Sequence, residues 1–128
     1  MRYVSHLFNS SLDLYIHIVI CSSNEKALSN AIAVGVAHYR GLDALILNAG
    51  VIDPLCRIGD DTPLESWKQN FDVNFFSLVT ALKASLPYLR KSKLTGRVVF
   101  VSSGAAVKGN PGQAPYNAAK AAMNSLCR

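Results

Sequence analysis

The 128-residue sequence predicts an α/β fold, a doubly wound, parallel sheet of about three strands with flanking helices. Two observations predict this class. Segments with helical spacing alternate with strand-like segments from residue 24 onward, and the strand-like runs are short and continuously apolar. Continuous apolar runs are typical of parallel strands that helices cover on both faces. Residues 24–128 are therefore expected to form a partial α/β domain, preceded by a poorly defined segment over residues 1–23.

The first expected helix covers residues 22–41. Two serines at its start can cap it, and Gly41 is expected to end it. Apolar side chains recur on one helical stripe, namely Leu28, Ile32, Val36 and Tyr39. A stripe of this kind indicates a helix that packs one face on a neighbouring layer.

A second, longer helix is expected from Thr62 to about Lys91. Thr62 is placed as its N-cap, Pro63 at its first position, and Glu65 as the residue that completes a capping box. A proline inside a helix removes a backbone donor, so a bend is expected near Pro87. A terminal helix is expected after a glycine-rich loop.

Three segments are expected as strands. Residues 42–50 (LDALILNAG) and 96–103 (GRVVFVSS) contain short apolar runs with glycine or serine beside them. A third strand is expected over residues 14–20, where the apolar run is too short to cross a membrane and is interrupted by Asp13 and His17. Helices between successive strands make the strands parallel, and ligands of such sheets bind at the carboxyl ends of the strands.

Composition and charge argue against several classes of function. Basic residues outnumber acidic ones by 13 to 8, but they are scattered, and their densest run (LRKSKLTGR) is typical of a helix end and its loop. No groove-reading or aromatic motif accompanies them, so neither nucleic acid nor a membrane is expected as a partner. Cys21, Cys56 and Cys127 lack metal-ligand spacing. We expect free thiols in a reducing compartment, a cytoplasmic location and no metal site.

Tyr116 and Lys120 are the strongest candidates for catalytic chemistry. Helical residues four apart lie on one face with Cβ atoms about 5–6 Å apart, so these two side chains can share one cavity. The pKa of a free tyrosine is near 10, and a neighbouring cation lowers it by stabilising the phenolate. Tyr116 would then serve as an acid and a base near neutral pH. Ser103, at the carboxyl end of a strand, can hydrogen-bond a substrate carbonyl and orient it.

Four motifs in this order resemble those of the short-chain dehydrogenases/reductases: LNAG at residues 47–50, NFDVNFFS in the long helix, GRVVFVSSGAA on a strand, and YNAAK as the Tyr-x-x-x-Lys pair. The resemblance covers residues 24–128 and is greatest to fungal carbonyl reductases of the sepiapterin- and benzil-reductase-like branch. It implies a partial Rossmann-like fold and an NAD(P)-dependent oxidoreductase that reduces a small carbonyl compound or oxidises the alcohol. NADP or NAD is the implied cofactor.

The resemblance also implies roles for individual residues. Four would be catalytic: Ser103, Tyr116, Lys120 and Asn74. The lysine would also hold the nicotinamide ribose, and the asparagine would hold a water that relays protons. The residues close to the cofactor would be Asn48, Ala49, Gly50, Tyr116 and Lys120. The long and terminal helices resemble the family's oligomer interfaces, which implies a homo-oligomer through these two helices.

Each assignment has a structural alternative. Tyr116 and Lys120 can be an ordinary pair on an amphipathic helix, and Ser103 can simply end a strand. Asn74 stands among phenylalanines and a valine, and it can equally mark the solvent face of its helix. Asn48 can serve only to tie neighbouring strands together by hydrogen bonds.

The sequence departs from the family pattern in several places, and two of them matter most. Its eight glycines form no glycine-rich turn of the kind that binds a cofactor pyrophosphate after a strand, and the strand expected after the terminal helix is missing. We therefore expect a fragment of a complete reductase, which binds nicotinamide cofactors weakly and turns them over negligibly. The alternative function is a non-catalytic remnant that at most associates with full-length relatives.

Overall fold

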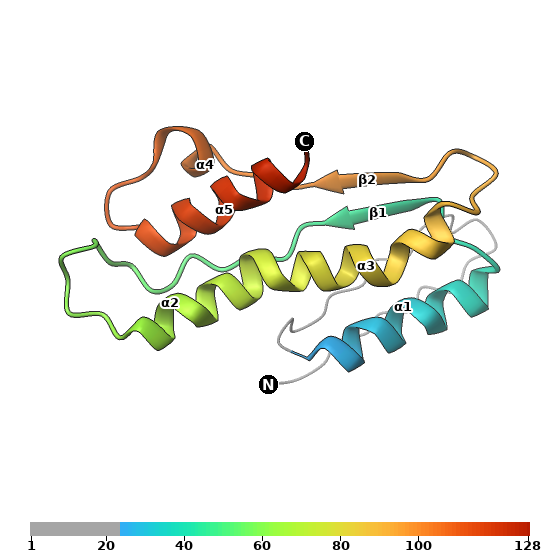
Figure 1. Cartoon of the computed structure of the whole chain (residues 1–128), viewed down its shortest axis with the longest axis horizontal. Helices are drawn as coiled ribbons and strands as arrows, with labels where there is room; N and C mark the ends of the chain where they lie inside the picture. Colours follow the sequence, from blue (N-terminus) through green and yellow to red (C-terminus); the bar gives the residue numbers. More distant parts are fainter. Residues whose placement is uncertain (1–23) are drawn as a thin grey trace, which may run out of the picture.

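The computed structural model describes residues 24–128, and the strand expected over residues 14–20 lies outside them. The described elements are, in order, α1 (Glu25–Tyr39), β1 (Ala44–Leu47), α2 (Leu64–Phe71), the π-helix η1 (Asp72–Phe76), α3 (Ser77–Leu89), β2 (Arg97–Phe100), α4 (Ala105–Lys108) and α5 (Ala114–Leu126). Helices alternate with strands, so the predicted α/β class is confirmed. Figure 1 shows α2 and α3 as one long rod beside the two strands.

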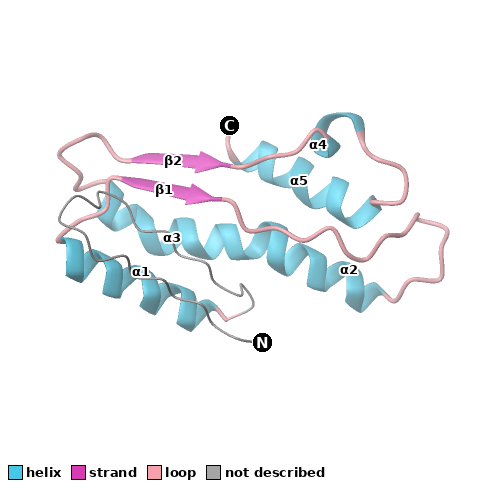
Figure 2. Cartoon of the chain, turned by 180° about the vertical axis from the view of Figure 1, so that it is seen from behind, coloured by secondary structure: helices cyan, strands magenta, loops and turns pink. Residues whose placement is uncertain are grey.

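The strands β1 and β2 are parallel neighbours. Ala44 pairs with Arg97 at one end, and Leu47 pairs with Phe100 at the other. The chain between them runs through α2, η1 and α3, because parallel strands cannot be joined by a tight turn. Both strands therefore point the same way and end at the same edge of the sheet (Figure 2).

Helix α1 is capped by a residue other than the expected serines. Asn24 has an extended backbone, and its side-chain oxygen accepts a hydrogen bond from the backbone N–H of Ala27. An asparagine oxygen satisfies an unpaired N–H of the first turn as well as a serine hydroxyl does, so the helix simply starts one residue later. Arg40 ends α1 in a left-handed conformation with φ of 62°, immediately before Gly41.

The capping expected for the long helix is wrong. Pro63 has φ of −54° and ψ of 135°, which is not helical, so this proline is itself the N-cap. Glu65 pairs with Lys68 at 3.5 Å and does not complete a capping box, and within the described residues no side chain caps this end. Thr62 lies outside the helix because its backbone N–H donates to the carbonyl of Asp60 at 2.8 Å.

The long helix contains a π-helical turn that was not predicted. In η1 the backbone N–H of Ser77 donates to the carbonyl of Asp72, five residues earlier. The buried hydroxyl of Ser77 donates to the carbonyl of Val73 at 2.7 Å, which gives that carbonyl a partner. α3 then continues through Pro87 and ends two residues before the predicted end. Such turns are frequent at functional sites, and this one carries Asn74.

The hydrophobic core lies between the helices and one face of the sheet. Its buried side chains are Leu28, Ile32, Leu47, Leu78, Ala81 and Met123. Val98 and Phe100 of β2 pack against this cluster. Met123 is fully buried and belongs to α5, so the core also holds the helix that carries Tyr116 and Lys120.

The opposite face of the sheet is exposed. Ile46 of β1 is 65% exposed, and Val99, which pairs with it on β2, is 50% exposed. The expectation that helices cover both faces is therefore wrong for residues 24–128. The strands are apolar on both sides, as their composition predicted, but the helices of the described residues pack on the side of Leu47 and Phe100.

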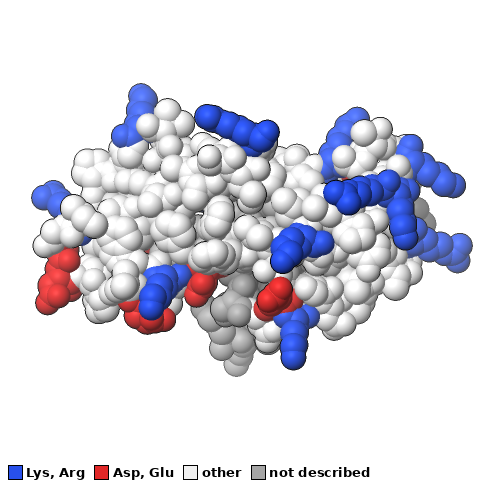
Figure 3. Space-filling model, in the orientation of Figure 1, with Lys and Arg blue, Asp and Glu red and all other residues white. Residues whose placement is uncertain are grey.

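Lysine and arginine side chains gather at one end of the molecule (Figure 3). This end holds the loop between α3 and β2, with the exposed cations Arg90, Lys91 and Lys93, and the start of β2 with the exposed Arg97. They follow the last turn of α3, where cations favour the negative end of the helix dipole, as the sequence indicated. Among the described residues, no helix is both long enough and apolar enough to cross a bilayer.

Because Ile46 and Val99 contact solvent, replacing both with threonine should change the free energy of unfolding by less than about 0.5 kcal/mol per residue. The double variant should also bind less of a dye that reports apolar surface. Chemical denaturation and dye fluorescence measure the two effects. Leu45→Thr, on the covered face of the same strand, is the control and should cost at least about 1 kcal/mol. A comparable loss in the double variant would show that the exposed face is covered in solution.

Candidate active site

The candidate residues lie where the two strands end. Asn48, Ala49 and Gly50 follow β1, and Ser103 comes shortly after β2. The backbone N–H of Val101 donates to the carbonyl of Leu47 at 3.0 Å, so the strands stay paired up to this edge. The parallel sheet therefore brings two distant segments of the chain together, as the sequence predicted.

The terminal helix α5 is tied to the loop after β1 as well as to the core. Cys56 is buried, its backbone bridges to Gln113, and its carbonyl accepts a hydrogen bond from Ala114 N at 3.1 Å. One turn further on, the side chain of Asn117 donates to the carbonyl of Asn110 at 2.8 Å and accepts from its N–H at 3.2 Å. These bonds determine where α5 begins and hence where Tyr116 and Lys120 lie.

Lys120 is buried beneath the edge of the sheet. The residue is 3% exposed, and its Nζ donates to the carbonyl of Val101 at 3.0 Å. Burial removes water from the ammonium group and lowers the pKa of Lys120 below its ordinary value of 10.5. The Val101 carbonyl, just after the end of β2, is thus the hydrogen-bond partner of the Lys120 Nζ.

Tyr116 and Lys120 face each other on α5. The lysine Nζ lies 5.8 Å from the centre of the tyrosine ring, within the range of a cation–π contact. Tyr116 itself is half-buried. The predicted proximity of the two side chains is therefore present in the structure, with the cation on the inner side.

Gly50 lies against both Lys120 and Asn74. A Cβ added to Gly50 would stand 2.9 Å from Asn74 Oδ1 and 3.5 Å from Lys120 Nζ. The first distance is shorter than real Cβ contacts, so any other residue would displace the asparagine. Glycine is thus required here by the close approach of its neighbours.

Asn74 is fully buried and every polar atom of its side chain has a partner. Its Oδ1 accepts from Val51 N at 3.0 Å, and its Nδ2 donates to the carbonyls of Val51 at 2.8 Å and Asn70 at 2.9 Å. The alternative that Asn74 marks the solvent face of the helix is therefore wrong. Its carboxamide joins the π-helical turn to the loop after β1.

Asn70 is a buried residue of the site that sequence reasoning missed. Its Oδ1 accepts from Asn74 Nδ2 at 2.9 Å, and its own Nδ2 donates to the carbonyl of Asp53 at 2.6 Å. Only 1% of Asn70 is exposed. The sequence does contain a sign of this role: the two asparagines are four residues apart on a helix, among phenylalanines that predict a buried face.

The two serines after β2 have different surroundings. Ser102 donates its hydroxyl to Asn124 Oδ1 on α5 at 2.6 Å. The hydroxyl oxygen of Ser103 accepts from Ala105 N at 3.2 Å, which leaves its proton available to a ligand. Ser103 thus differs from Ser102 in having no hydrogen-bond acceptor among the described residues.

The segment that follows β1 is open to solvent. Asn48, Ala49 and Gly50 are all exposed, and Asn48 makes no side-chain hydrogen bond within residues 24–128. The alternative that Asn48 ties neighbouring strands together has no support in this part of the chain. Residues 24–128 contain no group of three histidine, cysteine, aspartate or glutamate side chains placed to hold a metal ion.

Lys120→Met should remove a pH dependence of stability. Because the pKa of Lys120 is lowered on folding, the unfolded chain holds more protons between that lowered pKa and 10.5. The free energy of unfolding should therefore rise with pH in this alkaline window, by at most about 1.4 kcal/mol per pH unit, and be reduced by a constant amount below it. Denaturation from pH 7 to 11 measures the difference from Lys120→Met. The exposed Lys83→Met is the control, and an identical pH profile for both variants would contradict the effect of burial.

Proteins of known sequence are similar to this chain. A profile of the family described as short chain dehydrogenase matches residues 6–128. An uncharacterized oxidoreductase of Schizosaccharomyces pombe is 45% identical over 96 residues, which are 75% of this chain and 38% of that protein. The benzil reductase ((S)-benzoin forming) of Saccharomyces cerevisiae is 42% identical over 86 residues, which are 65% of this chain and 33% of that protein.

Solved structures lead to the same family. A short-chain dehydrogenase/reductase of Saccharomyces cerevisiae superposes with a TM-score of 0.79 at 31% identity, over 90% of this chain and 44% of that one. The carveol dehydrogenase of Mycobacterium avium, solved in complex with NAD, gives a TM-score of 0.79 at 27% identity, over 85% of this chain and 39% of that one. This chain spans less than half the length of these relatives. A profile match along almost the whole sequence and a shared Rossmann-type fold together establish that the chain belongs to the short-chain dehydrogenase/reductase family.

Proposed function

We propose that this chain carries the catalytic part of an NAD(P)-dependent oxidoreductase that reduces a small carbonyl compound or oxidises the corresponding alcohol. The observation that supports it most directly is the buried ammonium group of Lys120, next to Tyr116 on one side and Gly50 on the other. A charged group is rarely buried without a functional reason, since desolvation costs free energy. Family membership supports the reaction class.

The residues present fit the nicotinamide end of a cofactor. Gly50 is exposed, as are Asn48 and Ala49 before it, and the absence of a side chain at Gly50 would let a flat ring and a ribose approach the backbone close to Lys120. Asn48, Ala49, Gly50, Tyr116 and Lys120 would hold this end, with the ammonium group donating to ribose hydroxyls. When bound, the cofactor supplies or accepts a hydride. Both NADP and NAD are compatible with these contacts.

The roles we propose for the remaining side chains follow from their surroundings. Ser103 has a hydroxyl proton to donate to a substrate carbonyl, and Tyr116 can exchange a proton with the same oxygen. Lys120 offsets the negative charge that proton loss leaves on Tyr116. Asn74 Oδ1 accepts a hydrogen bond from one backbone N–H. Its second lone pair can therefore hold a water, and this water can relay a proton from solvent to the site.

The substrate class is a small carbonyl compound. One relative is named for the reduction of benzil, a diketone, and this supports an aromatic or aliphatic ketone as the first compound to test. A cytoplasmic location is also part of the proposal, supported by the free thiols of Cys56 and Cys127.

Tyr116→Phe should abolish reduction of benzil. Removing the hydroxyl removes the proton donor, so the rate should fall by about a hundredfold or more at saturating cofactor. Binding of NADH and NADPH is titrated first, by nicotinamide fluorescence. Oxidation of the reduced cofactor by benzil is then followed by its absorbance. Because the 128 residues contain no glycine-rich turn, we expect weak binding and slow turnover in the parent chain.

Tyr39→Phe, at an exposed position on α1, is the matched control and should leave the rate unchanged. An equal rate for Tyr116→Phe and the parent chain would contradict the assigned chemistry. Absence of cofactor binding at millimolar concentration would favour the alternative function, a non-catalytic chain that associates with full-length relatives.

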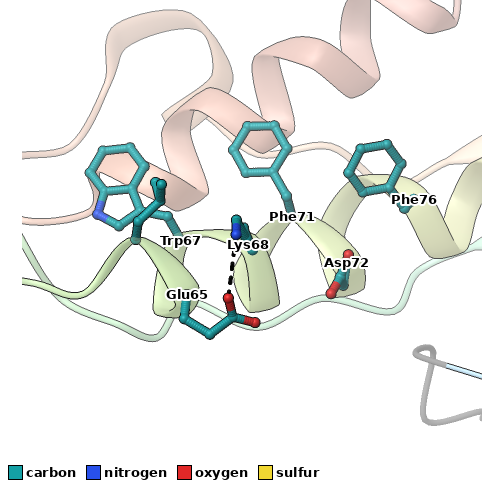
Figure 4. A pocket seen from close by; sticks show the side chains of 7 residues that line it. Glu65, Trp67, Lys68, Phe71, Asp72 and Phe76 are labelled. Atoms are coloured by element: carbon teal, nitrogen blue, oxygen red, sulfur yellow. Dashed lines mark hydrogen bonds and ion pairs between the residues drawn. The ribbon is translucent and has the colours of Figure 1, made fainter.

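We also propose that α2 and η1 pair with a second copy of the chain. They line a hollow of about 470 Å³ with Leu64, Glu65, Trp67, Lys68, Phe71, Asp72 and Phe76. Leu64 and Phe76 are 69% and 54% exposed, and Figure 4 shows Trp67, Phe71 and Phe76 on the same side of the helix. The exposed alanines of α5, Ala118 and Ala121, offer a second flat surface beside α2.

The charges along this surface favour an antiparallel pair of identical helices. If the two helix axes cross at the level of residue 70, whose own side chain points inward, Leu64 of one copy meets Phe76 of the other, and Lys68 meets Asp72. Each copy then supplies both partners of each contact, which is what a two-fold interface requires. Apolar residues at the ends and opposite charges between them make the surface complementary to itself.

Lys68→Glu should weaken this dimer, because it places two acidic side chains opposite each other. Asp72→Lys alone should do the same, and the double variant should restore association by reversing the pair. Sedimentation equilibrium at several concentrations measures the dissociation constant, with a change of roughly tenfold expected for each single variant. Failure of the double variant to recover would exclude this arrangement. Exposed Lys108→Glu, on α4, controls for net charge.

A further inference from the structure

We propose that Asn70 is a positioning residue of the candidate active site. It acts by holding the segment Val51–Asp53 against the long helix, and this segment in turn orients Asn74. The inference rests on the proposed function, because it assigns Asn70 a role in a site whose chemistry is itself proposed.

The donor side of Asn70 holds three consecutive carbonyls. Its Nδ2 lies 3.3 Å from the carbonyl oxygen of Val51, 3.4 Å from that of Ile52 and 2.6 Å from that of Asp53. An amide nitrogen has two protons, so the three oxygens share them and the shortest contact is to Asp53. The segment after Gly50 is thereby drawn onto the start of the π-helical turn.

The acceptor side of Asn70 faces Asn74. Asn70 Oδ1 and the Asn70 carbonyl each lie 2.9 Å from Asn74 Nδ2, and the carbonyl of Val51 lies 2.8 Å from it. Three acceptors around one nitrogen determine the orientation of the Asn74 carboxamide, because turning it over would set its oxygen against three oxygens. Asn74 Oδ1 is consequently directed to Val51 N and to the position beside Gly50.

The effect reaches Lys120 through Gly50. Asn74 Oδ1 and Lys120 Nζ lie on two sides of the place where a Gly50 Cβ would be, at 2.9 Å and 3.5 Å. Releasing the Val51–Asp53 segment would move Gly50 and free Asn74 from both of its Val51 contacts. A shift of about 1 Å among such groups can cost on the order of a hundredfold in rate. Asn70 itself is 1% exposed, so it does not contact a ligand directly and can act only through its neighbours.

The test replaces Asn70 with leucine, which keeps the volume and removes the hydrogen bonds. We expect hydrogen exchange of the Val51 N–H and of the Asn74 side-chain amide to accelerate at least tenfold, measured by NMR. The amides of Leu28 and Ile32 in α1 report global stability, and their exchange should accelerate clearly less than that of Val51 and Asn74, by about tenfold. Ser77→Ala is the matched control, since it removes another buried hydrogen bond of the same turn without touching the loop.

Unchanged exchange at Val51 and Asn74, or equal acceleration in α1, would overturn the proposal. Asn70→Ala serves if the leucine variant does not fold, because it leaves room for water in place of the carboxamide. In benzil reduction, Asn70→Leu should lower kcat tenfold or more and change KM for NADPH less than threefold, whereas a rise in KM alone would contradict a positioning role.

The two hypotheses fail in different ways. If the parent chain shows no turnover that depends on Tyr116, the proposed function fails, while the exchange measurements still decide whether Asn70 orients Asn74. If turnover depends on Tyr116 but Asn70→Leu leaves both exchange and kcat unchanged, only the positioning role fails.

Discussion

The candidate site of this structure depends on the burial of one ammonium group. Lys120 lies under the edge of the sheet, and its charge is partly compensated by the carbonyl of Val101. That carbonyl is available because it follows the last residue of β2, where the strand pairing has just ended. The cation therefore depends on the position of the strand end, on the core that holds α5 and on a glycine that leaves space beside it. Burying a charged group costs free energy, so a site built around the Lys120 ammonium group indicates that its charge has a function.

Much of the fold could be predicted because the signals were local. The apolar runs around Leu47 and Phe100 and the stripe through Leu28 and Ile32 depend on side chains a few residues apart, and the structure has strands and a helix there. The ends of elements were harder to predict. The N-cap of α1 is Asn24 and not one of the serines, and the N-cap of α2 is Pro63 and not Thr62. The position of a cap depends on the backbone angles of a single residue, and a sequence with several suitable residues in a row does not show which one has them.

The candidate site could be predicted in part for a related reason. Tyr116 and Lys120 stand one helical turn apart, so their proximity follows from the helix alone. The partnership of Asn70 with the Val51–Asp53 segment joins residues 17 or more apart, and no local pattern contains it. The π-helical turn at Asn74 likewise depends on contacts from outside the helix. The exposed face of Ile46 and Val99 could not be predicted either, because an apolar strand shows only that it can be covered.

The attachment of the loop after β1 has a consequence for changes in its length. This loop is held at its start by Asn70 and in its middle by Cys56, whose carbonyl receives the first N–H of α5. Between Arg57 and Thr62 the chain is an exposed turn, with Arg57 N bonded to Asp60 Oδ2 at 2.6 Å. Extra residues inserted in that turn would extend into solvent and leave α5 in place. One residue added between Asp53 and Cys56 would instead strain or break the hydrogen bond from the Ala114 N–H to the Cys56 carbonyl, because α5 is also held by the core. The two halves of a single loop thus differ in how much insertion and deletion they tolerate.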